Sequence, residues 1–306
     1  MKTVQDILSS GIAYLEARQV EGARASMQSM LAHVLGTNRT WLYLHMDEPV
    51  GEAALAPLRE LLRKRGQGVP LQHLLGQVEF YRRNFRTDGR ALIPRPETEE
   101  LVELALGLVP QKQGLRVLDM GCGSGVIGIS LALELRHLQP HVVLADVSAA
   151  ALDLALENAT SLAARVCTCR SDLFSAWQPA ESEEDTRIVP PSPFDLMVAN
   201  LPYVPDGELV AREVQHDPST ALYGGPDGLD IIRRFVADAL PHMAPGGLAL
   251  LEVGHDQGEQ VCGMMRAAGY ERVELRRDMS GAARFPMGYA PAASAEVEAA
   301  AAETEA

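Results

Sequence analysis

The four residues Asn200-Leu201-Pro202-Tyr203 end an apolar run and could bind a primary amide or amine. The side-chain oxygen of Asn200 and the backbone carbonyl of Leu201 or Pro202 can both accept hydrogen bonds from one NH2 group. Two such acceptors would hold the nitrogen about 3–3.5 Å from an electrophile, with its lone pair aimed at that centre. Pro202 stiffens the loop and brings no N–H donor, and Tyr203 offers a flat face to a planar amide.

The reaction that suits this motif is methyl transfer to nitrogen. A nitrogen becomes more acidic as it is alkylated, so its proton can leave afterwards and no general base has to act first. We identify no catalytic His or Cys near the motif. An ordinary turn is the alternative explanation for an isolated Asn-x-Pro-Tyr sequence.

A glycine-rich stretch lies upstream, at residues 118–125 (Leu-Asp-Met-Gly-Cys-Gly-Ser-Gly). Alternate glycines let the backbone turn tightly and let a ligand lie against it. Gly123, Gly125 and Gly128 also match the dinucleotide spacing G-x-G-x-x-G, so a nicotinamide cofactor is one alternative. A plain tight turn is another.

Two acidic residues favour S-adenosylmethionine over a dinucleotide. Asp119 precedes the glycines, where it would repel a pyrophosphate and attract the ammonium of a methionine. Asp146 ends the next predicted strand, where its carboxylate can bind both ribose hydroxyls. Asp172 and Leu173 follow the third strand and could contact adenine, although Asp172 could instead cap a turn.

These motifs need a sheet that brings strand ends together. The sequence predicts an α/β fold, with a mostly parallel sheet covered by helices on both faces, whose strand carboxyl ends bind ligands. The predicted strands are 116–119, 142–146, 166–169, 195–199 and 248–253, and predicted helices include 149–159 and 229–239.

The rest of the chain divides by composition. Residues 1–76 are predicted to form a helical bundle, because apolar residues such as Val4, Ile7 and Leu8 recur at helical spacing. Residues 77–96 are predicted to be a β-hairpin linker that turns at Asp88-Gly89. The predicted catalytic domain covers 97–290 and contains an acidic, proline-rich loop at 179–193, and an Ala/Glu-rich disordered tail covers 291–306.

Charge and composition narrow the class of partner. Net charge is −14 overall, made up of +3 over residues 1–90 and −17 beyond them. An acidic catalytic domain argues against a nucleic-acid substrate. The chain has no long apolar run and no signal-peptide core at its start, so we expect a cytoplasmic protein without a membrane span, monomeric by default. The four cysteines have no metal-ligand spacing, so we expect reduced thiols and no metal.

Several segments resemble the peptide chain release factor N5-glutamine methyltransferases (PrmC/HemK family). The hallmark is Ala-Leu-Ile-Pro-Arg-Pro-Glu-Thr-Glu at residues 91–99. Other matching segments are 65–76, 213–229, Leu-Glu-Val-Gly at 251–254 and Arg-Asp-Met-Ser-Gly at 277–281. The chain is therefore identified as a member of this family over roughly residues 1–290.

The resemblance implies a class I methyltransferase domain with a Rossmann-like, seven-stranded sheet, and an N-terminal helical domain that grips a release factor. It implies methylation of the glutamine in a Gly-Gly-Gln motif. Together with the residue chemistry, it gives the expected cofactor contacts Asp119, Gly121, Cys122, Gly123, Ser124, Gly125, Asp146, Asp172, Leu173 and Asn200. The expected substrate contacts are Asn200, Leu201, Pro202 and Tyr203, of which Asn200, Pro202 and Tyr203 are the expected catalytic residues.

The chain departs from the family pattern at Leu201, where proline is usual, although the backbone carbonyl is kept. Glutamine methylation of a ribosomal protein and adenine N6 methylation of nucleic acid are the alternative reactions, and a non-catalytic docking module is the alternative class. The role of residues 94–99 stays open between a substrate entrance and a structural linker. Basic residues near the domain junction are hypothesised to steer an acidic partner: Arg59, Arg63, Lys64, Arg65, Arg82, Arg83, Arg86 and Arg90.

Overall fold

A computed structural model describes residues 2–178, 190 and 192–292. The chain divides into two compact units. The first contains Met1–Val78, Thr87–Gly89 and Val210–Asp217, and the second contains Glu79–Arg86, Arg90–Leu209 and Pro218–Ala306. The predicted tail beyond residue 292 and nearly all of the predicted loop at 179–193 lie outside the described residues.

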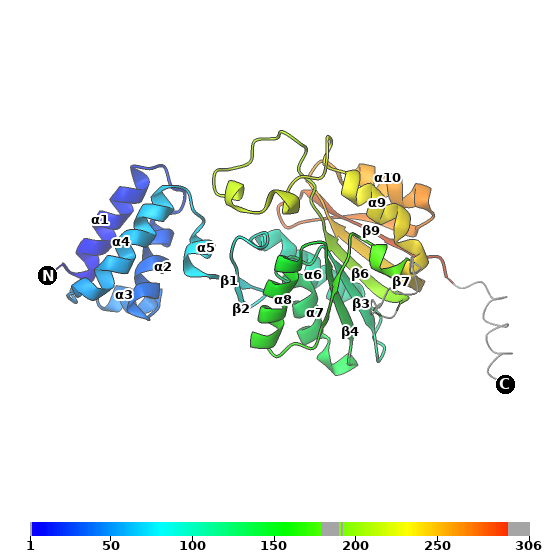
Figure 1. The fold of residues 1–306 in the computed structure, drawn as a ribbon, viewed down its shortest axis with the longest axis horizontal. Coiled ribbons are helices and arrows are strands. Elements are labelled where there is room, and N and C mark those ends of the chain that lie inside the picture. The colour runs from blue at the N-terminus through cyan, green and yellow to red at the C-terminus, as the bar shows by residue number, and fades with distance from the viewer. Residues whose placement is uncertain (1, 179–189, 191, 293–306) are drawn as a thin grey trace. The chain divides into compact units, whose positions relative to one another are not determined.

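The first unit contains helices packed around their own apolar core, as the spacing of apolar residues predicts (Figure 1). Its first helix begins at a capping box, in which the Asp6 N–H donates to Thr3 Oγ1 (3.2 Å) and the Thr3 N–H donates to Asp6 Oδ2 (3.0 Å). Val4, Ile7 and Leu8 then fall on one buried face. The helices are α1 (Val4–Glu16), α2 (Ala23–Leu35), α3 (Arg39–Leu44), α4 (Glu52–Gly66) and α5 (Leu71–Leu75).

A segment from later in the chain completes this unit. Arg65 is buried, with 3% of its surface exposed, and its Nη2 donates to Glu213 Oε1 at 2.6 Å. Its other nitrogens donate to Ser26 Oγ (3.2 Å) and to the Val69 carbonyl (3.2 Å). A buried guanidinium needs such partners, so these contacts hold Val210–Asp217 against the helices.

A β-hairpin follows α5, but its turn differs from the predicted one at Asp88-Gly89. Strands β1 (Gln77–Phe80) and β2 (Arg83–Arg86) are joined at Tyr81 and Arg82, which have φ angles of 45° and 62°. Two central residues with positive φ match the twist of the paired strands, which selects this two-residue turn. The buried rings of Phe80 and Phe85 pack edge to face on either side of it. The predicted turn at Asp88-Gly89 is therefore wrong, because these residues follow the hairpin.

The second unit is built on a seven-stranded, mostly parallel sheet, which confirms the predicted fold class. Strand order is β5-β4-β3-β6-β7-β9-β8, and β9 alone runs antiparallel to its neighbours β7 and β8. The strands are β3 (Arg116–Met120), β4 (His141–Asp146), β5 (Cys167–Arg170), β6 (Phe194–Asn200), β7 (Met243–Glu252), β8 (Glu271–Arg277) and β9 (Ala283–Tyr289).

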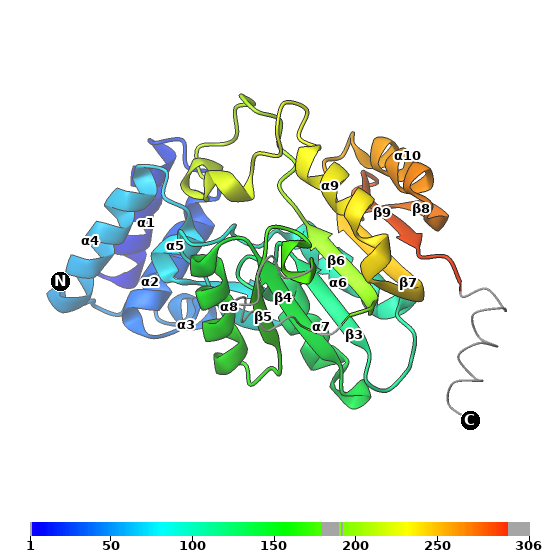
Figure 2. The same ribbon diagram turned by 45° about the vertical axis from the view of Figure 1, so that its right-hand side comes forward.

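Helices cover both faces of this sheet (Figures 1 and 2). One core cluster joins side chains of β3, β6 and β7 to those of α9 (Asp230–Asp238) and α10 (Gly258–Ala268). Helices α6 (Pro96–Leu108), α7 (Val126–Glu134) and α8 (Ala149–Ser161) pack on strands from the other side. The short 3-10 helices are η1 (Arg136–Leu138), η2 (Ser175–Trp177), η3 (Val214–His216), η4 (Ser219–Ala221) and η5 (Leu240–His242).

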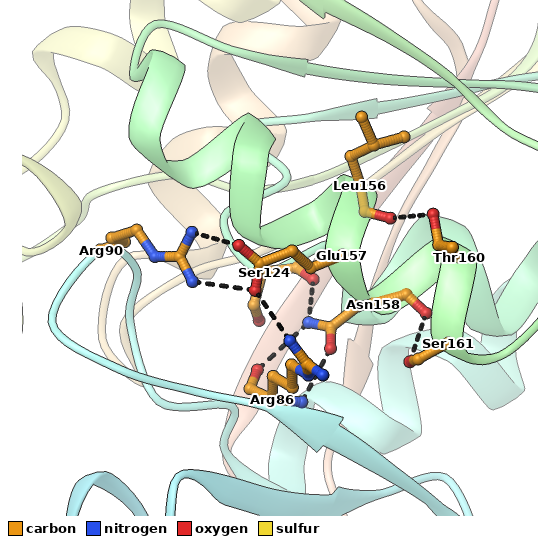
Figure 3. Close-up of polar contacts among 8 residues, drawn as sticks. All are labelled: Arg86, Arg90, Ser124, Leu156, Glu157, Asn158, Thr160 and Ser161. Atoms are coloured by element: carbon orange, nitrogen blue, oxygen red, sulfur yellow. Dashed lines mark hydrogen bonds and ion pairs between the residues drawn. The ribbon is translucent and has the colours of Figure 1, made fainter.

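Helix α8 fastens the hairpin to the glycine-rich loop (Figure 3). Asn158 is fully buried, and its Oδ1 accepts from the Arg86 N–H at 2.7 Å. Its Nδ2 donates to the Arg86 carbonyl (3.1 Å) and to the Ser124 carbonyl (3.0 Å). The neighbouring Glu157 pairs with Arg86 and Arg90. One buried amide thus satisfies backbone groups of β2 and of the loop after β3.

In the part of the chain that the structure describes, no helix has the length and apolar character needed to cross a membrane. The four cysteines are free thiols, of which Cys167 is exposed and Cys122, Cys169 and Cys262 are buried.

Candidate active site

A cavity of about 170 Å³ lies in the second unit, where the parallel strands end. It is lined by residues that follow β3, β4, β5 and β6, such as Gly121, Val147, Ser171 and Leu201. This is the edge at which open α/β sheets bind ligands. The predicted site residues that line it are Gly121, Cys122, Gly123, Ser124, Asp146, Asp172, Leu173, Asn200, Leu201 and Pro202, whereas Asp119, Gly125 and Tyr203 do not.

The glycine loop takes a backbone form that other residues avoid. Gly121 has a φ of 71° and Gly123 a φ of 54°, both in the left-handed region. A Cβ on Gly121 would lie 2.8 Å from Leu201 Cδ2. The missing Cβ therefore makes room for the Leu201 side chain, so the departure from the family motif at 201 is accommodated by packing across the site.

Asp146 is placed to bind hydroxyl groups. Its Oδ2 accepts from the Gly123 N–H (2.9 Å) and its Oδ1 accepts from the Ser148 N–H (2.9 Å). Burial raises the pKa of Asp146, and these backbone hydrogen bonds act against that rise. A carboxylate has about four lone-pair sites, so both oxygens keep capacity for a ribose.

Asp119 belongs to β3 and does not line the cavity. It is fully buried, its Oδ2 accepts from the Gly128 N–H at 2.8 Å, and its Oδ1 has no hydrogen-bond partner among the described residues. Burial raises the pKa of Asp119 to about 7. Its observed contact fastens the first turn of α7, and binding of an ammonium by its Oδ1 stays a prediction.

Leu173 and Asp172 form the wall after β5. Leu173 has a φ of 49°, which is strained for a residue with a Cβ, and it lines the cavity as an apolar surface. Asp172 Oδ2 accepts from Arg234 Nη2 at 3.0 Å, and Arg234 also lines the cavity. Arg234, which reaches the cavity from α9, lies in no sequence motif and is a site residue that only the structure reveals.

Asn200 ends β6 and faces the cavity. Its Nδ2 donates to Thr98 Oγ1 at 3.3 Å, which leaves Oδ1 as the acceptor of this amide. Thr98 stands in the first turn of α6 and lines the cavity together with Pro94 and Arg95. These three residues therefore form part of the cavity wall, and a role of residues 94–99 at the substrate entrance stays a prediction.

The carbonyl oxygens that follow Asn200 face different ways. The Pro202 oxygen lies 2.4 Å from the position that a Cβ on Gly224 would take, so it faces that loop. The Tyr203 carbonyl accepts from Gln257 Nε2 at 2.9 Å, and its ring packs against the core. Burial raises the pKa of Tyr203. By elimination, the Leu201 carbonyl is the candidate second acceptor beside Asn200.

The basic residues proposed to steer a partner all have acidic partners. They belong to both units, with residues 59–65 in the first and 82–90 in the second. Their ion pairs are Arg59–Glu52, Arg63–Glu60, Lys64–Glu60, Arg65–Glu213, Arg82–Glu134, Arg83–Glu134, Arg86–Glu157 and Arg90–Glu157.

The donor set fits S-adenosylmethionine. Asp146 suits the ribose, Leu173 suits the adenine ring, and the glycine loop leaves room for a ligand beside Asn200. With the seven-stranded sheet, this arrangement defines a class I S-adenosylmethionine-dependent methyltransferase.

Comparison with known proteins narrows this class. Residues 6–76 match the PrmC N-terminal domain, and residues 102–211 match the methyltransferase small domain. The release factor glutamine methyltransferase of Bordetella pertussis is 38% identical over 293 residues, covering 94% of this chain and 100% of that protein. The protein of the same name from Deinococcus radiodurans is 36% identical over 284 residues, covering 92% of this chain and 96% of that one. The chain belongs to the release factor glutamine methyltransferase family.

Among solved structures, a release factor-specific protein-(glutamine-N5) methyltransferase from Alicyclobacillus acidocaldarius is 28% identical. It covers 65% of this chain and 94% of its own, with a TM-score of 0.40.

Proposed function

We propose that this protein transfers a methyl group from S-adenosylmethionine to the side-chain amide nitrogen of the glutamine in the Gly-Gly-Gln motif of peptide chain release factors. The observation that carries the proposal is that Asn200 and Leu201 line one cavity with the glycine loop. Asn200 Oδ1 and the Leu201 carbonyl are the proposed pair of acceptors. Family membership supports the choice of substrate.

The protein's own residues act by position. When bound, S-adenosylmethionine supplies an electrophilic methyl group. Asn200 and the Leu201 carbonyl accept the two N–H bonds of the glutamine amide and aim its lone pair at that group. The nitrogen loses one proton after alkylation, so the product is a neutral N5-methylglutamine. Tyr203 packs against the core and holds the loop, and the aromatic contact with the substrate amide stays a prediction.

The helical unit is proposed to grip the release factor, and the second unit to carry out the reaction. The family match over residues 6–76 supports this assignment to the helices. The net charge of −14 favours a protein substrate without direct nucleic-acid contact. A monomeric, cytoplasmic protein stays a prediction.

Intact-mass spectrometry tests the proposed function. A purified release factor is incubated with the protein and S-adenosylmethionine, and the modified peptide is then sequenced. We expect a gain of one methyl mass on the glutamine of Gly-Gly-Gln, because that amide fits the acceptor pair. A release factor in which this glutamine is replaced by alanine serves as the matched control. Methylation elsewhere on the release factor, or none with cofactor binding intact, would reject the substrate.

A further inference from the structure

A buried polar cluster lies behind the Asn200 side chain. Asn200 and Glu252 are register partners on the neighbouring parallel strands β6 and β7, so their side chains leave the sheet on the same face. Helix α6, which carries Thr98, packs against both strands. Thr98 is 3% exposed and Glu252 is 1% exposed. Neither residue has a role in the mechanism described above.

When Glu252 is ionised, the hydrogen-bonding capacities of the three side chains allow one arrangement. An ionised carboxylate only accepts, so the Thr98 hydroxyl must then donate its single hydrogen to Glu252. The lone pairs of Thr98 Oγ1 then face Asn200 and can receive only an N–H. This places Asn200 Nδ2 toward the protein, as observed at 3.3 Å, and Oδ1 away from it.

We propose that Glu252 is a positioning residue which, through Thr98 and by its own contact with Asn200, holds the Asn200 amide with Oδ1 toward the substrate. The inference rests on the proposed function, because it assigns to Oδ1 the task of accepting from the glutamine NH2. A reversed amide would present Nδ2 to that NH2 group, donor against donor, and would abolish the binding geometry.

The electrostatic setting of Glu252 supports this role. Its Oε2 is buried and has no hydrogen-bond partner in the described part of the chain, which costs stability. Burial raises the pKa of Glu252 to about 7, against the effect of hydrogen bonds from Thr98 and Asn200 and of the nearby Arg284. Glu97 and Tyr203 are the other titratable groups that act on it. Arg284 is itself paired with Asp278. A carboxyl group held at this cost is expected to serve the site.

The first test is Glu252→Gln, which keeps the size and removes the charge. A glutamine can donate to Thr98 Oγ1, so the Thr98 hydrogen is free to point at Asn200 and to favour the reversed amide. We expect kcat to fall about 100-fold, with S-adenosylmethionine affinity changed less than twofold. We also expect the kcat of the wild type to rise with pH near 7 as Glu252 ionises, and this rise should be absent in Glu252→Gln. Thr98→Ser should keep activity and Thr98→Val should lose it.

Asp195→Asn is the matched control. Asp195 is also a buried carboxylate, but it lies on β6 near the opposite end of the strand from Asn200. It pairs with Lys112 and accepts from the Arg116 N–H. The substitution should lower stability and leave kcat unchanged. If Glu252→Gln retains kcat within twofold and keeps the pH limb, the proposal is overturned.

A second measurement needs neither substrate nor variant activity. In wild-type protein labelled with 15N-asparagine and 13C-glutamate, the Asn200 side-chain NH2 resonance should titrate together with the Glu252 carboxyl. It should not move in Glu252→Gln. An Asn200 resonance that stays fixed while Glu252 titrates overturns the positioning role. Coupled titration in a protein that methylates no release factor would instead reject the proposed function and leave the coupling intact.

Discussion

At the scale of single residues, the carboxyl groups of Asp119 and Glu252 are unusual in their pKa. Burial raises the pKa of each to about 7. Each is buried among apolar strands and lacks a hydrogen-bond partner on one oxygen within the described residues. A raised pKa means that the folded state binds the proton more tightly than the unfolded chain does. These groups therefore oppose folding once they ionise.

The sign of this effect gives a prediction for Glu252. Its contribution to stability is fully present below the unfolded pKa of 4.5 and is lost as pH rises through about 7. The loss is on the order of 3 kcal/mol, at 1.36 kcal/mol per pKa unit. Urea unfolding of wild type and Glu252→Gln at pH 5 and pH 8 measures it. The variant should gain stability relative to wild type at the higher pH, and an identical pH dependence of the two proteins would contradict the assigned environment.

Part of the candidate site could be predicted from the sequence. Asn200, Asp146 and the glycines carry their chemistry in their type and spacing, and they line the cavity. Thr98 and Glu252 stand in recognised motifs, yet their contact depends on the register of β6 with β7 and on the packing of α6. No spacing within one segment encodes a contact between three elements, so the cluster could be found only in the structure.

At the scale of elements, α8 joins the hairpin to the cofactor loop. The side chain of Asn158 binds two backbone groups of Arg86 and one of Ser124. The buried amide of Asn158 thus bridges the backbone of β2 and the backbone of the glycine loop, as a neighbouring strand would. The position of β2 and the shape of the glycine loop therefore depend on the same residue.

Replacing Asn158 with alanine should affect both elements. Three buried backbone groups would lose their partner, so we expect a loss of about 2–4 kcal/mol in the free energy of unfolding. S-adenosylmethionine affinity should also fall, because the Ser124 carbonyl is no longer held. Chemical denaturation and calorimetry measure the two effects. Asn84→Ala, an exposed asparagine on the same β2 strand, is the matched control and should change neither. An Asn158→Ala protein with unchanged stability would contradict this account of the anchor.

The residue pattern predicts the parallel strands of the sheet but not β8 and β9, and the difference has a physical reason. Of the five parallel strands, β3, β4, β6 and β7 contain apolar runs, whereas β5 is a short Cys-Thr-Cys-Arg segment. The predicted bounds of each agree with the observed ones to within a few residues, except at the start of β7. Strand β8 has an exposed, charged pattern typical of a sheet edge, and β9 contains Pro286 and Gly288. Only the strand number that the family resemblance implies, seven, accounts for them, and neither strand was predicted from its own residues. The hairpin turn was misplaced because Tyr81-Arg82 lacks the glycine or asparagine usual at positive φ.

At the scale of the whole molecule, charge is arranged in pairs. The chain carries a net charge of −14, and the basic residues at 59–65 and 82–90 each contact a carboxylate. Paired charges have a weaker field at long range than the same cations alone. Steering of an acidic partner by these residues stays a hypothesis.

In the proposed mechanism, methyl transfer in the second unit depends on the acceptor pair after β6, Asn200 Oδ1 and the Leu201 carbonyl. The most direct test is the single-turnover rate of methyl transfer to a release factor by Asn200→Ala at saturating S-adenosylmethionine. We predict a fall of about 100-fold or more, because the amide nitrogen is no longer aimed at the methyl group. A rate within a fewfold of the wild-type value would contradict the mechanism.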